Sequence, residues 1–248
     1  AQYWLYRGEP EKALQALARV PQEFFEEFAA REPKAFLAGW AHAVAGRATA
    51  AQAEWRVALG LVAVWLALQL DPYAQLFAVA GAVLAVTYPW LKRVVHVPQF
   101  YLGIAFGWSI PMAFAAETGE VPKIAWLLLT AVVLWAAVYD TMYAMVDRED
   151  DLRIGVKSTA ILFGEADRLV IAVMMAMMLF ALHLAGQEAE LGAWYRAGLV
   201  VAALHFAWEL WLIRRREPEA CFRAFNNNHF VGMAVFVGLA LDYLYRGT

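Results

Sequence analysis

Seven long apolar stretches constrain the fold of this chain more than any other feature of its sequence. They cover residues 55–70, 73–91, 97–116, 124–146, 167–186, 194–213 and 229–245. An α-helix needs about 20 mostly apolar residues to cross a bilayer, and it pairs its own backbone polar groups within the lipid. The chain is also 62% hydrophobic, above the share found in soluble domains. We therefore predict an all-α integral membrane protein with about seven transmembrane helices.

Basic residues lie in alternate loops between these stretches. The loops after the second, fourth and sixth stretches hold Lys92, Arg93, Arg148, Arg153, Lys157, Arg168, Arg214, Arg215, Arg216 and Arg223. Lys123 is the only cation in the intervening loops. Because Lys and Arg gather on the cytoplasmic side of short loops, we expect the three basic loops to face the cytoplasm.

A cluster of acidic residues lies at the end of the fourth apolar stretch. Asp140 is the only acid of residues 124–146, and an ionisable residue inside a membrane span usually faces a cavity or a partner. If the helix continues past residue 146, Asp147 and Asp151 lie on one face, with Asp150 beside them. Oxygen ligands of this kind suit Mg²⁺, which also binds substrate phosphates. The cluster indicates a metal–diphosphate site; the alternative is a solvated acidic helix end.

Two basic loops are expected on the same side of the membrane as these acids. Arg153 and Lys157 follow the acidic cluster, and Lys92 and Arg93 follow Pro89. Such cations hold the outer oxygens of a diphosphate, although the positive-inside bias also accounts for them. The next segment predicts a short helix that Ser158 or Thr159 caps and Gly164 ends. Acids and bases on one side favour an anionic substrate delivered through the membrane.

Composition excludes several other classes of protein. Cys221 is the only cysteine, so an intramolecular disulfide is excluded, and no Cys/His spacing indicates a zinc site. A net charge of -3 gives no basis for nucleic-acid binding. The lipid bilayer is the expected partner, and the sequence does not specify an oligomeric state.

Five motifs resemble those of the 4-hydroxybenzoate polyprenyltransferases of ubiquinone synthesis, which are UbiA intramembrane prenyltransferases. They are Tyr-Pro-Trp-Leu-Lys-Arg (88–93), Gly-Trp-Ser-Ile-Pro-Met-Ala-Phe-Ala-Ala (107–116), Tyr-Asp-Thr-Met-Tyr-Ala-Met-Val-Asp-Arg-Glu-Asp-Asp (139–151), Ile-Gly-Val-Lys-Ser-Thr-Ala-Ile-Leu-Phe-Gly (154–164) and Cys-Phe-Arg-Ala-Phe-Asn-Asn-Asn-His-Phe-Val-Gly (221–232). The resemblance extends from about Arg47 to the C-terminus. It implies a nine-helix membrane bundle, of which about seven helices are visible here, around a cavity that opens sideways to lipid.

The resemblance also implies an activity. Members of the family transfer a polyprenyl group from a polyprenyl diphosphate, held through Mg²⁺, to the ring carbon ortho to the hydroxyl of 4-hydroxybenzoate. The implied location is the cell inner membrane, with the active site facing the cytoplasm. By position, the implied roles are metal ligands (Asp147, Asp150, Asp151), a catalytic role for Asp147, Asp151 and Arg93, diphosphate contacts (Lys92, Arg153, Lys157) and cavity-lining residues (Tyr139, Asp140, Tyr143).

The front of the chain departs from the family pattern. Family members begin with two further membrane helices and a first Asp-rich motif, whereas residues 1–50 here contain no Asp. These residues instead predict soluble or surface amphipathic helices divided by Pro10, Pro21 and Pro33. We therefore divide the chain into an amphipathic segment, 1–50, and an intramembrane prenyltransferase domain, 51–248. The front end indicates a truncated or fused version, or a diverged member that builds its first metal site in another way.

Two alternative functions remain open at this stage. The loss of one Asp-rich motif is expected to impair activity, which leaves a non-catalytic or truncated membrane protein whose N-terminal helices bind a partner. The other alternative is the same reaction on another aromatic acceptor, such as a naphthoate, a chlorin or haem.

Overall fold

The structure is a computed structural model that describes residues 9–18, 38, 41–43, 45–95, 97–155 and 157–245, without the side chains of residues 16, 17, 92–94 and 154. Every regular element in these ranges is a helix, which confirms the all-α prediction. The chain forms two compact units, Ala1–Gln75 and Leu76–Thr248, and each is described by itself.

The first unit contains α2 (Pro10–Ala18), α4 (Ala48–Leu68) and the first residues of α5 (Pro72–Val94). In α2, Ala13 is fully buried whereas Glu11 and Lys12 are exposed. Arg47 forms an ion pair with Glu11, with 3.0 Å between nitrogen and oxygen. Within the predicted amphipathic segment 1–50, residues 1–8, 19–37, 39–40 and 44 lie outside the described part of the chain.

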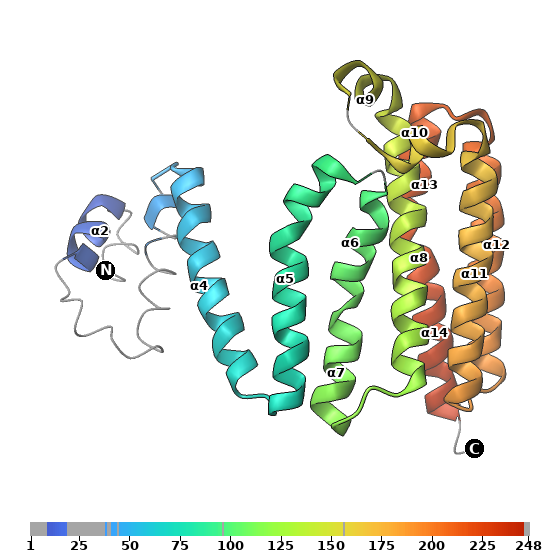
Figure 1. Cartoon of the computed structure of the whole chain (residues 1–248), viewed down its shortest axis with the longest axis horizontal. Helices are drawn as coiled ribbons and strands as arrows, with labels where there is room; N and C mark the ends of the chain where they lie inside the picture. Colours follow the sequence, from blue (N-terminus) through green and yellow to red (C-terminus); the bar gives the residue numbers. More distant parts are fainter. Residues whose placement is uncertain are drawn as a thin grey trace. The chain divides into compact units, whose positions relative to one another are not determined.

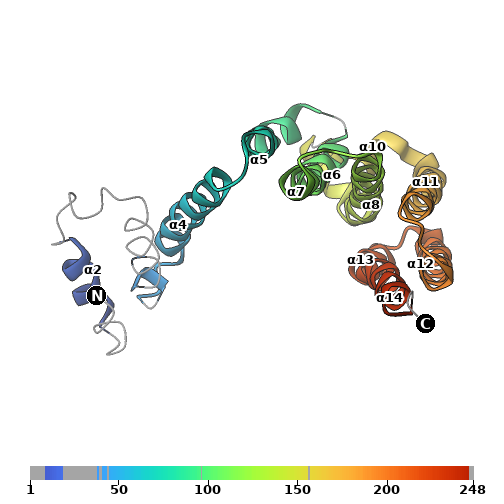
Figure 2. The same cartoon turned by 90° about the horizontal axis from the view of Figure 1, so that it is seen from below.

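The second unit is built around α8 (Lys123–Val146), as Figures 1 and 2 show. α8 packs against α6 (Pro98–Gly107), α7 (Ser109–Thr118), α10 (Thr159–Phe163), α11 (Asp167–Glu188) and α13 (Pro218–Asn227). α12 (Ala193–Leu212) packs closely against α14 (His229–Tyr245). The remaining elements are α9 (Arg148–Ile154), η2 (Gly164–Ala166) and η3 (Ile213–Arg215).

Five helices in the described ranges are long and apolar enough to cross a membrane: Ala48–Leu68, Pro72–Leu91, Lys123–Val146, Thr159–Glu188 and Ala193–Arg215. The last predicted span, 229–245, is the single helix α14, whose 17 residues have the predicted bounds. The third is divided into α6 and α7, because Pro111 lacks an N–H group and its ring clashes with the carbonyl four residues earlier, at Gly107. The chain is a multi-pass membrane protein.

Glycines permit close packing of the helices in the second unit. A Cβ atom at Gly103 of α6 would lie 2.8 Å from the Cα of Val133 in α8. A Cβ at Gly198 of α12 would lie 2.7 Å from the carbonyl oxygen of Ala234 in α14, and 3.0 Å from the Cα of Gly238. Small residues of this kind allow membrane helices to approach until their backbones touch.

We expect Gly198→Val to destabilise the pairing of α12 with α14. Its side chain would meet backbone atoms that cannot move independently, and overpacking of this kind costs about 2 kcal/mol. A fall in the thermal unfolding temperature in detergent would measure the effect. Gly60→Val is the matched control, since a Cβ at Gly60 would have no described atom within 4 Å. Equal unfolding temperatures for the two variants would contradict the prediction.

Candidate active site

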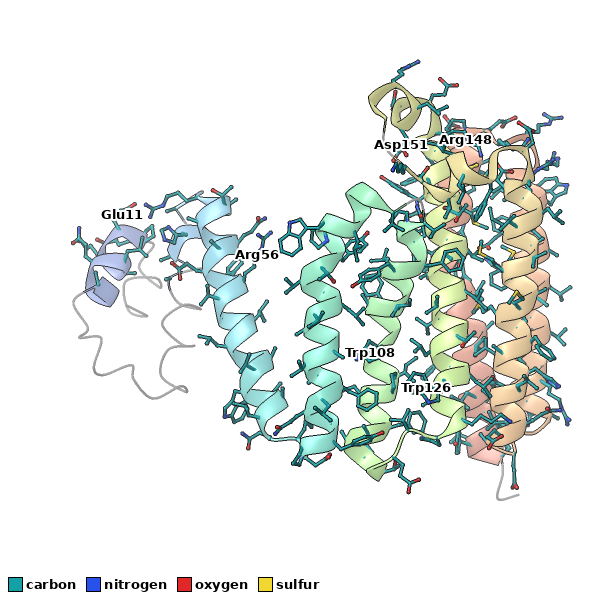
Figure 3. All side chains as sticks on the ribbon, viewed as in Figure 1. Glu11, Arg56, Trp108, Trp126, Arg148 and Asp151 are labelled. Carbon is teal, nitrogen blue, oxygen red and sulfur yellow. The ribbon has the colours of Figure 1, made fainter. Side chains whose placement is uncertain are left out.

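The acidic cluster lies at the junction of α8 and α9. Asp147 separates the two helices, with φ -91° and ψ 5°, so the helix does not continue unbroken as the sequence predicts. One helical turn is nevertheless kept, because the backbone N–H of Asp151 donates to the carbonyl of Asp147 over 2.8 Å. Asp147 and Asp151 therefore lie one turn apart on the same side, and both are half-buried. Figure 3 labels Asp151 at this end of the second unit.

Asp150 differs from these two acids in its surroundings. Its carboxylate is 76% exposed and accepts a hydrogen bond of 3.0 Å from Arg153, which also lies 3.7 Å from Glu149. Arg153 is thus engaged with acids of its own short helix. Lys157 is exposed, and it has an interaction partner of its own. Lys92 and Arg93 belong to the last turns of α5, but their side chains lie outside the described residues.

The carboxylates at this junction are candidate ligands for a metal ion. Within the described ranges, no group of three or more His, Cys, Asp or Glu side chains is arranged to hold a metal. Asp147 and Asp151 offer carboxylate oxygens from adjacent turns. This suits Mg²⁺, which is commonly bound by one or two carboxylates and takes its other ligands from water and substrate phosphates.

A buried ion network fixes this corner of the molecule. Asp167, at the start of α11, is fully buried and accepts from Arg148 over 2.6 Å and from Arg216 over 3.0 Å. Arg148 also donates to the carbonyl of Ala160 in α10 over 2.6 Å. The residue next to Asp147 therefore turns away from the acids and ties α9 to α10 and α11, and Figure 3 labels it beside Asp151.

The short helix α10 packs against α8 next to the ion network. Ser158 caps it by accepting a hydrogen bond from the N–H of Ile161 over 3.4 Å, and Gly164 ends it with φ 50°, which confirms the predicted helix. The hydroxyls of Thr159 and of Thr141 in α8 lie 2.7 Å apart in the buried interior. α10 is therefore joined to α8 just below the acids.

Aromatic side chains line α8 next to the acids, and we call Trp135, Tyr139, Tyr143 and Phe225 the aromatic wall. The ring centroids of Tyr139 and Tyr143 lie 6.1 and 5.1 Å from that of Phe225 in α13. Trp135 meets Tyr139 edge-on at 6.2 Å. Asp140 interacts electrostatically with Tyr139 and with Tyr88 of α5. The structure thus brings together the three residues that were expected to line a cavity: Tyr139, Asp140 and Tyr143.

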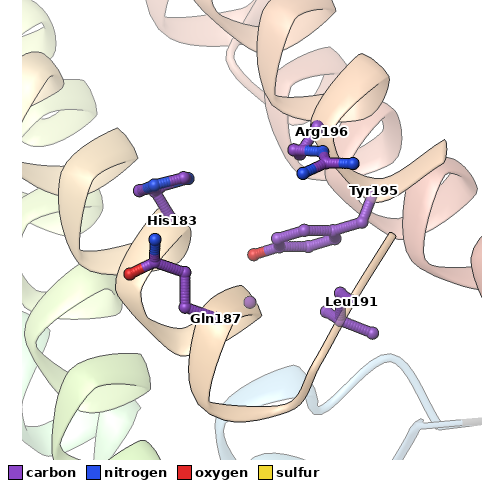
Figure 4. Close-up of a pocket in the computed structure, with 6 residues that line it drawn as sticks. His183, Gln187, Leu191, Tyr195 and Arg196 are labelled. Carbon is purple, nitrogen blue, oxygen red and sulfur yellow. The ribbon is translucent and has the colours of Figure 1, made fainter. Parts of the chain in front are cut away.

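A small cavity lies at the other end of α11, between it and α12 (Figure 4). It is lined by His183, Gly186, Gln187, Leu191, Tyr195 and Arg196 and has a volume of about 60 Å³. This volume holds only a few water molecules, so the cavity is too small for a substrate with a polyprenyl chain.

The orientation of the helices puts the basic C-terminal end of α5 at the same end of the second unit as the acids. α5 and α6 run antiparallel, since Trp108 donates to the carbonyl of Phe77 over 2.8 Å while Tyr101 stacks with Tyr88 at 6.4 Å. α6 and α8 are also antiparallel, since Gly103 approaches Val133 and Gly107 approaches Leu129. The C-terminal ends of α5 and α8 therefore lie at the same end of the second unit (Figure 1).

Comparison with known proteins identifies the family. The model of the UbiA prenyltransferase family matches residues 40–236, which is most of the chain. The chain therefore belongs to the UbiA prenyltransferase family, and the resemblance drawn from its motifs is confirmed.

The chain is similar to several curated proteins named 4-hydroxybenzoate octaprenyltransferase. It is 55% identical to the one from Alkalilimnicola ehrlichii, over 75% of this chain and 64% of that protein. It is 56% identical to the one from Nitrosococcus oceani, over 75% and 65% of the two chains, and 58% identical to that from Ectopseudomonas mendocina, over 67% and 56%. The chain thus spans less than two thirds of the length of these relatives.

Two solved structures share the fold. The apo structure of a UbiA homolog from Aeropyrum pernix K1 has a TM-score of 0.65 and 24% identity, and the match covers 97% of this chain and 95% of that one. A structure of digeranylgeranylglyceryl phosphate synthase has a TM-score of 0.61 and 18% identity, over 79% and 70% of the two chains. Both support the all-α membrane architecture.

We expect Asp167→Asn to destabilise the protein strongly. The neutral amide would leave Arg148 and Arg216 facing each other without their shared anion, and breaking a buried pair of this kind costs about 3 kcal/mol. Thermal unfolding in detergent would measure the loss. Asp150→Asn is the control, since its exposed pair with Arg153 is worth at most about 1 kcal/mol. An Asp167→Asn variant as stable as the control would contradict this role of the network.

We expect the thiol of Cys221 to react slowly at neutral pH. It is fully buried in α13, and burial raises its pKa to about 11. The thiolate is the reactive form, so the rate of alkylation should rise about tenfold per pH unit below that pKa. Mass spectrometry after timed iodoacetamide treatment would measure the rate, with protein unfolded in dodecyl sulfate as the control. A rate at pH 7 equal to that of unfolded protein would contradict burial.

Proposed function

We propose that this chain transfers a polyprenyl group from a polyprenyl diphosphate to 4-hydroxybenzoate, at the ring carbon ortho to the hydroxyl. The observation that carries the proposal is the pair Asp147 and Asp151, one turn apart at the basic end of the membrane helices and next to the aromatic wall. The relatives named 4-hydroxybenzoate octaprenyltransferase support the choice of acceptor.

Asp147 and Asp151 would hold Mg²⁺, and Asp150 lies beside them as a further carboxylate. The ion, when bound, supplies positive charge that stabilises the departing diphosphate. Lys157 and Arg153 follow the acids, and Lys92 and Arg93 end α5 at the same end of the unit. These cations would hold the outer phosphate oxygens, and we propose a catalytic role for Arg93 from its position in the motif of residues 88–93.

The aromatic wall would act on the hydrocarbon part of the donor. When the allylic C–O bond breaks, its electron pair leaves with the diphosphate and an allylic carbocation remains. The faces of Tyr139, Tyr143 and Phe225 attract a cation and exclude the water that would capture it. The aromatic ring of the acceptor then supplies the electron pair of the new C–C bond and loses the proton of that ring carbon.

The membrane would bring the polyprenyl donor within reach of this site. The polyprenyl chain dissolves in the bilayer, and the exposed apolar surface of α5, which includes Leu76, Val79, Val83 and Val86, suits contact with lipid. We propose the cell inner membrane as the location. The basic loops, and with them the acids, would face the cytoplasm.

We expect Asp147→Ala and Asp151→Ala to lower prenyl transfer by about 100-fold or more, because each removes an anion that holds the diphosphate through its metal. The measurement is prenylation of labelled 4-hydroxybenzoate by protein purified in detergent with Mg²⁺ and a polyprenyl diphosphate. Glu120→Gln, an exposed acid before the start of α8, is the control.

The result that would refute the proposal combines two observations. The wild-type chain would form no product, and the Asp147→Ala variant would bind the diphosphate as well as the wild type does. Assays with a naphthoate in place of 4-hydroxybenzoate would separate the choice of acceptor from the type of reaction.

A further inference from the structure

A buried acid in α12 lies outside the candidate metal–diphosphate site. Glu209 is fully buried within a helix long and apolar enough to span the membrane. One of its oxygens, Oε2, accepts a hydrogen bond of 3.0 Å from the side-chain amide of Asn228. The amide oxygen of Asn228 in turn accepts from the indole N–H of Trp135. Two buried side chains, Glu209 and Asn228, and the partly buried Trp135 thus link α12, the residue between α13 and α14, and α8.

The second oxygen of Glu209 is not satisfied in the same way. Oε1 lies 3.3 Å from Nε2 of His205, one turn earlier in α12, but it has no hydrogen-bond partner among the described residues. The same His205 nitrogen lies 3.2 Å from the carbonyl oxygen of Asn227. A buried carboxyl with one unpaired oxygen is costly, and an ionisable residue inside a membrane span usually serves a function.

Trp135 connects this network to the aromatic wall. A Cβ atom at Gly232 of α14 would lie 2.6 Å from Cη2 of Trp135, so the indole ring rests directly on the α14 backbone. The indole also meets the ring of Tyr139 edge-on, at 6.2 Å between centroids. The position of the indole, and with it one side of Tyr139, is thus fixed by the bond to Asn228 and by the lack of a side chain at Gly232.

The other side of the aromatic wall depends on the same residue, Asn228, through its backbone N–H group. Phe225 lies in the last turn of α13, three residues before Asn228, and the N–H of Asn228 donates to its carbonyl over 3.3 Å. Phe225 is the ring that contacts both Tyr139 and Tyr143. A shift of Asn228 would therefore displace both members of the contact between α8 and α13.

We propose that Glu209 and Asn228 are positioning residues that hold the rings of the aromatic wall in place beside Asp147 and Asp151. Glu209 acts as a hydrogen-bond acceptor for Asn228 and does not itself exchange a proton with the substrate. This inference rests on the proposed prenyl transfer, in which the wall surrounds the allylic carbocation. A wall out of register would admit water to that cation.

The test uses the fate of the cation as its main measurement. Captured by the acceptor, the cation gives the prenylated product, and captured by water it gives the prenyl alcohol. The ratio of alcohol to product does not depend on how much protein is folded, so a merely structural defect would leave it unchanged. Four variants of the full chain are compared: Glu209→Leu, Glu209→Gln, Trp135→Phe and Thr130→Val.

Glu209→Leu removes the acceptor for Asn228, and Trp135→Phe removes the indole N–H, so both should raise the ratio of alcohol to product about fivefold or more by admitting water. Glu209→Gln keeps an acceptor oxygen and should match the wild type. Thr130→Val is the control, because Thr130 is exposed on α8 and its hydroxyl donates to the carbonyl of Trp126 in its own helix. A Glu209→Gln variant with the same defect as Glu209→Leu would overturn the proposal.

Alkylation of Cys221 separates failure of this inference from failure of the proposed function. Cys221 lies in α13, and loss of the Asn228 anchor should open that helix more often and speed its alkylation about tenfold in Glu209→Leu, with Glu209→Gln unchanged. A wild-type chain that forms no product would refute prenyl transfer, while the alkylation rates would still judge the network. Equal rates in all four variants and the wild type would overturn it.

Discussion

The ion network of Asp167 with Arg148 and Arg216 is the interaction on which the candidate site depends. A carboxylate fully removed from water is tolerated because two guanidinium groups and a backbone N–H surround it. The three side chains come from the start of α9, the start of α11 and the loop before α13. They tie the start of α9 to α10 and α11, and Asp147 and Asp151 lie at the junction of α8 and α9.

Much of the fold follows from patterns that a sequence displays directly. Apolar length gives the long helices α5, α8, α11 and α12, and the caps at Ser158 and Gly164 give the bounds of α10. The division of the third span at Trp108 was missed because hydropathy averages over Pro111. The break at Asp147 was missed because helical spacing alone does not indicate where one helix ends and another begins.

The site was predicted only in part, for a physical reason. Asp140, Tyr139 and Tyr143 come together because one helix carries them, so their spacing is enough. Asp167 and Glu209 pair with residues 49 and 19 positions away, which no local spacing reveals. Glu209 could still have been found, since it is the only acid of the stretch 194–213 and thus meets the criterion that singled out Asp140.

The two buried acids have a common effect on α13, the short helix that carries Phe225. Arg216, two residues before α13 begins, binds Asp167, and Asn228, directly after α13 ends, binds Glu209. α13 is amphipathic and buries only Cys221 and Ala224, so its apolar contacts alone give little resistance to sliding along α8. Hydrogen bonds are directional, including those between guanidinium and carboxylate groups. One such bond at each end of α13 sets both the position and the rotation of the helix. Polar groups outside the aromatic wall therefore set the position of its rings. One of these groups, Asp167, also belongs to the ion network beside Asp147 and Asp151.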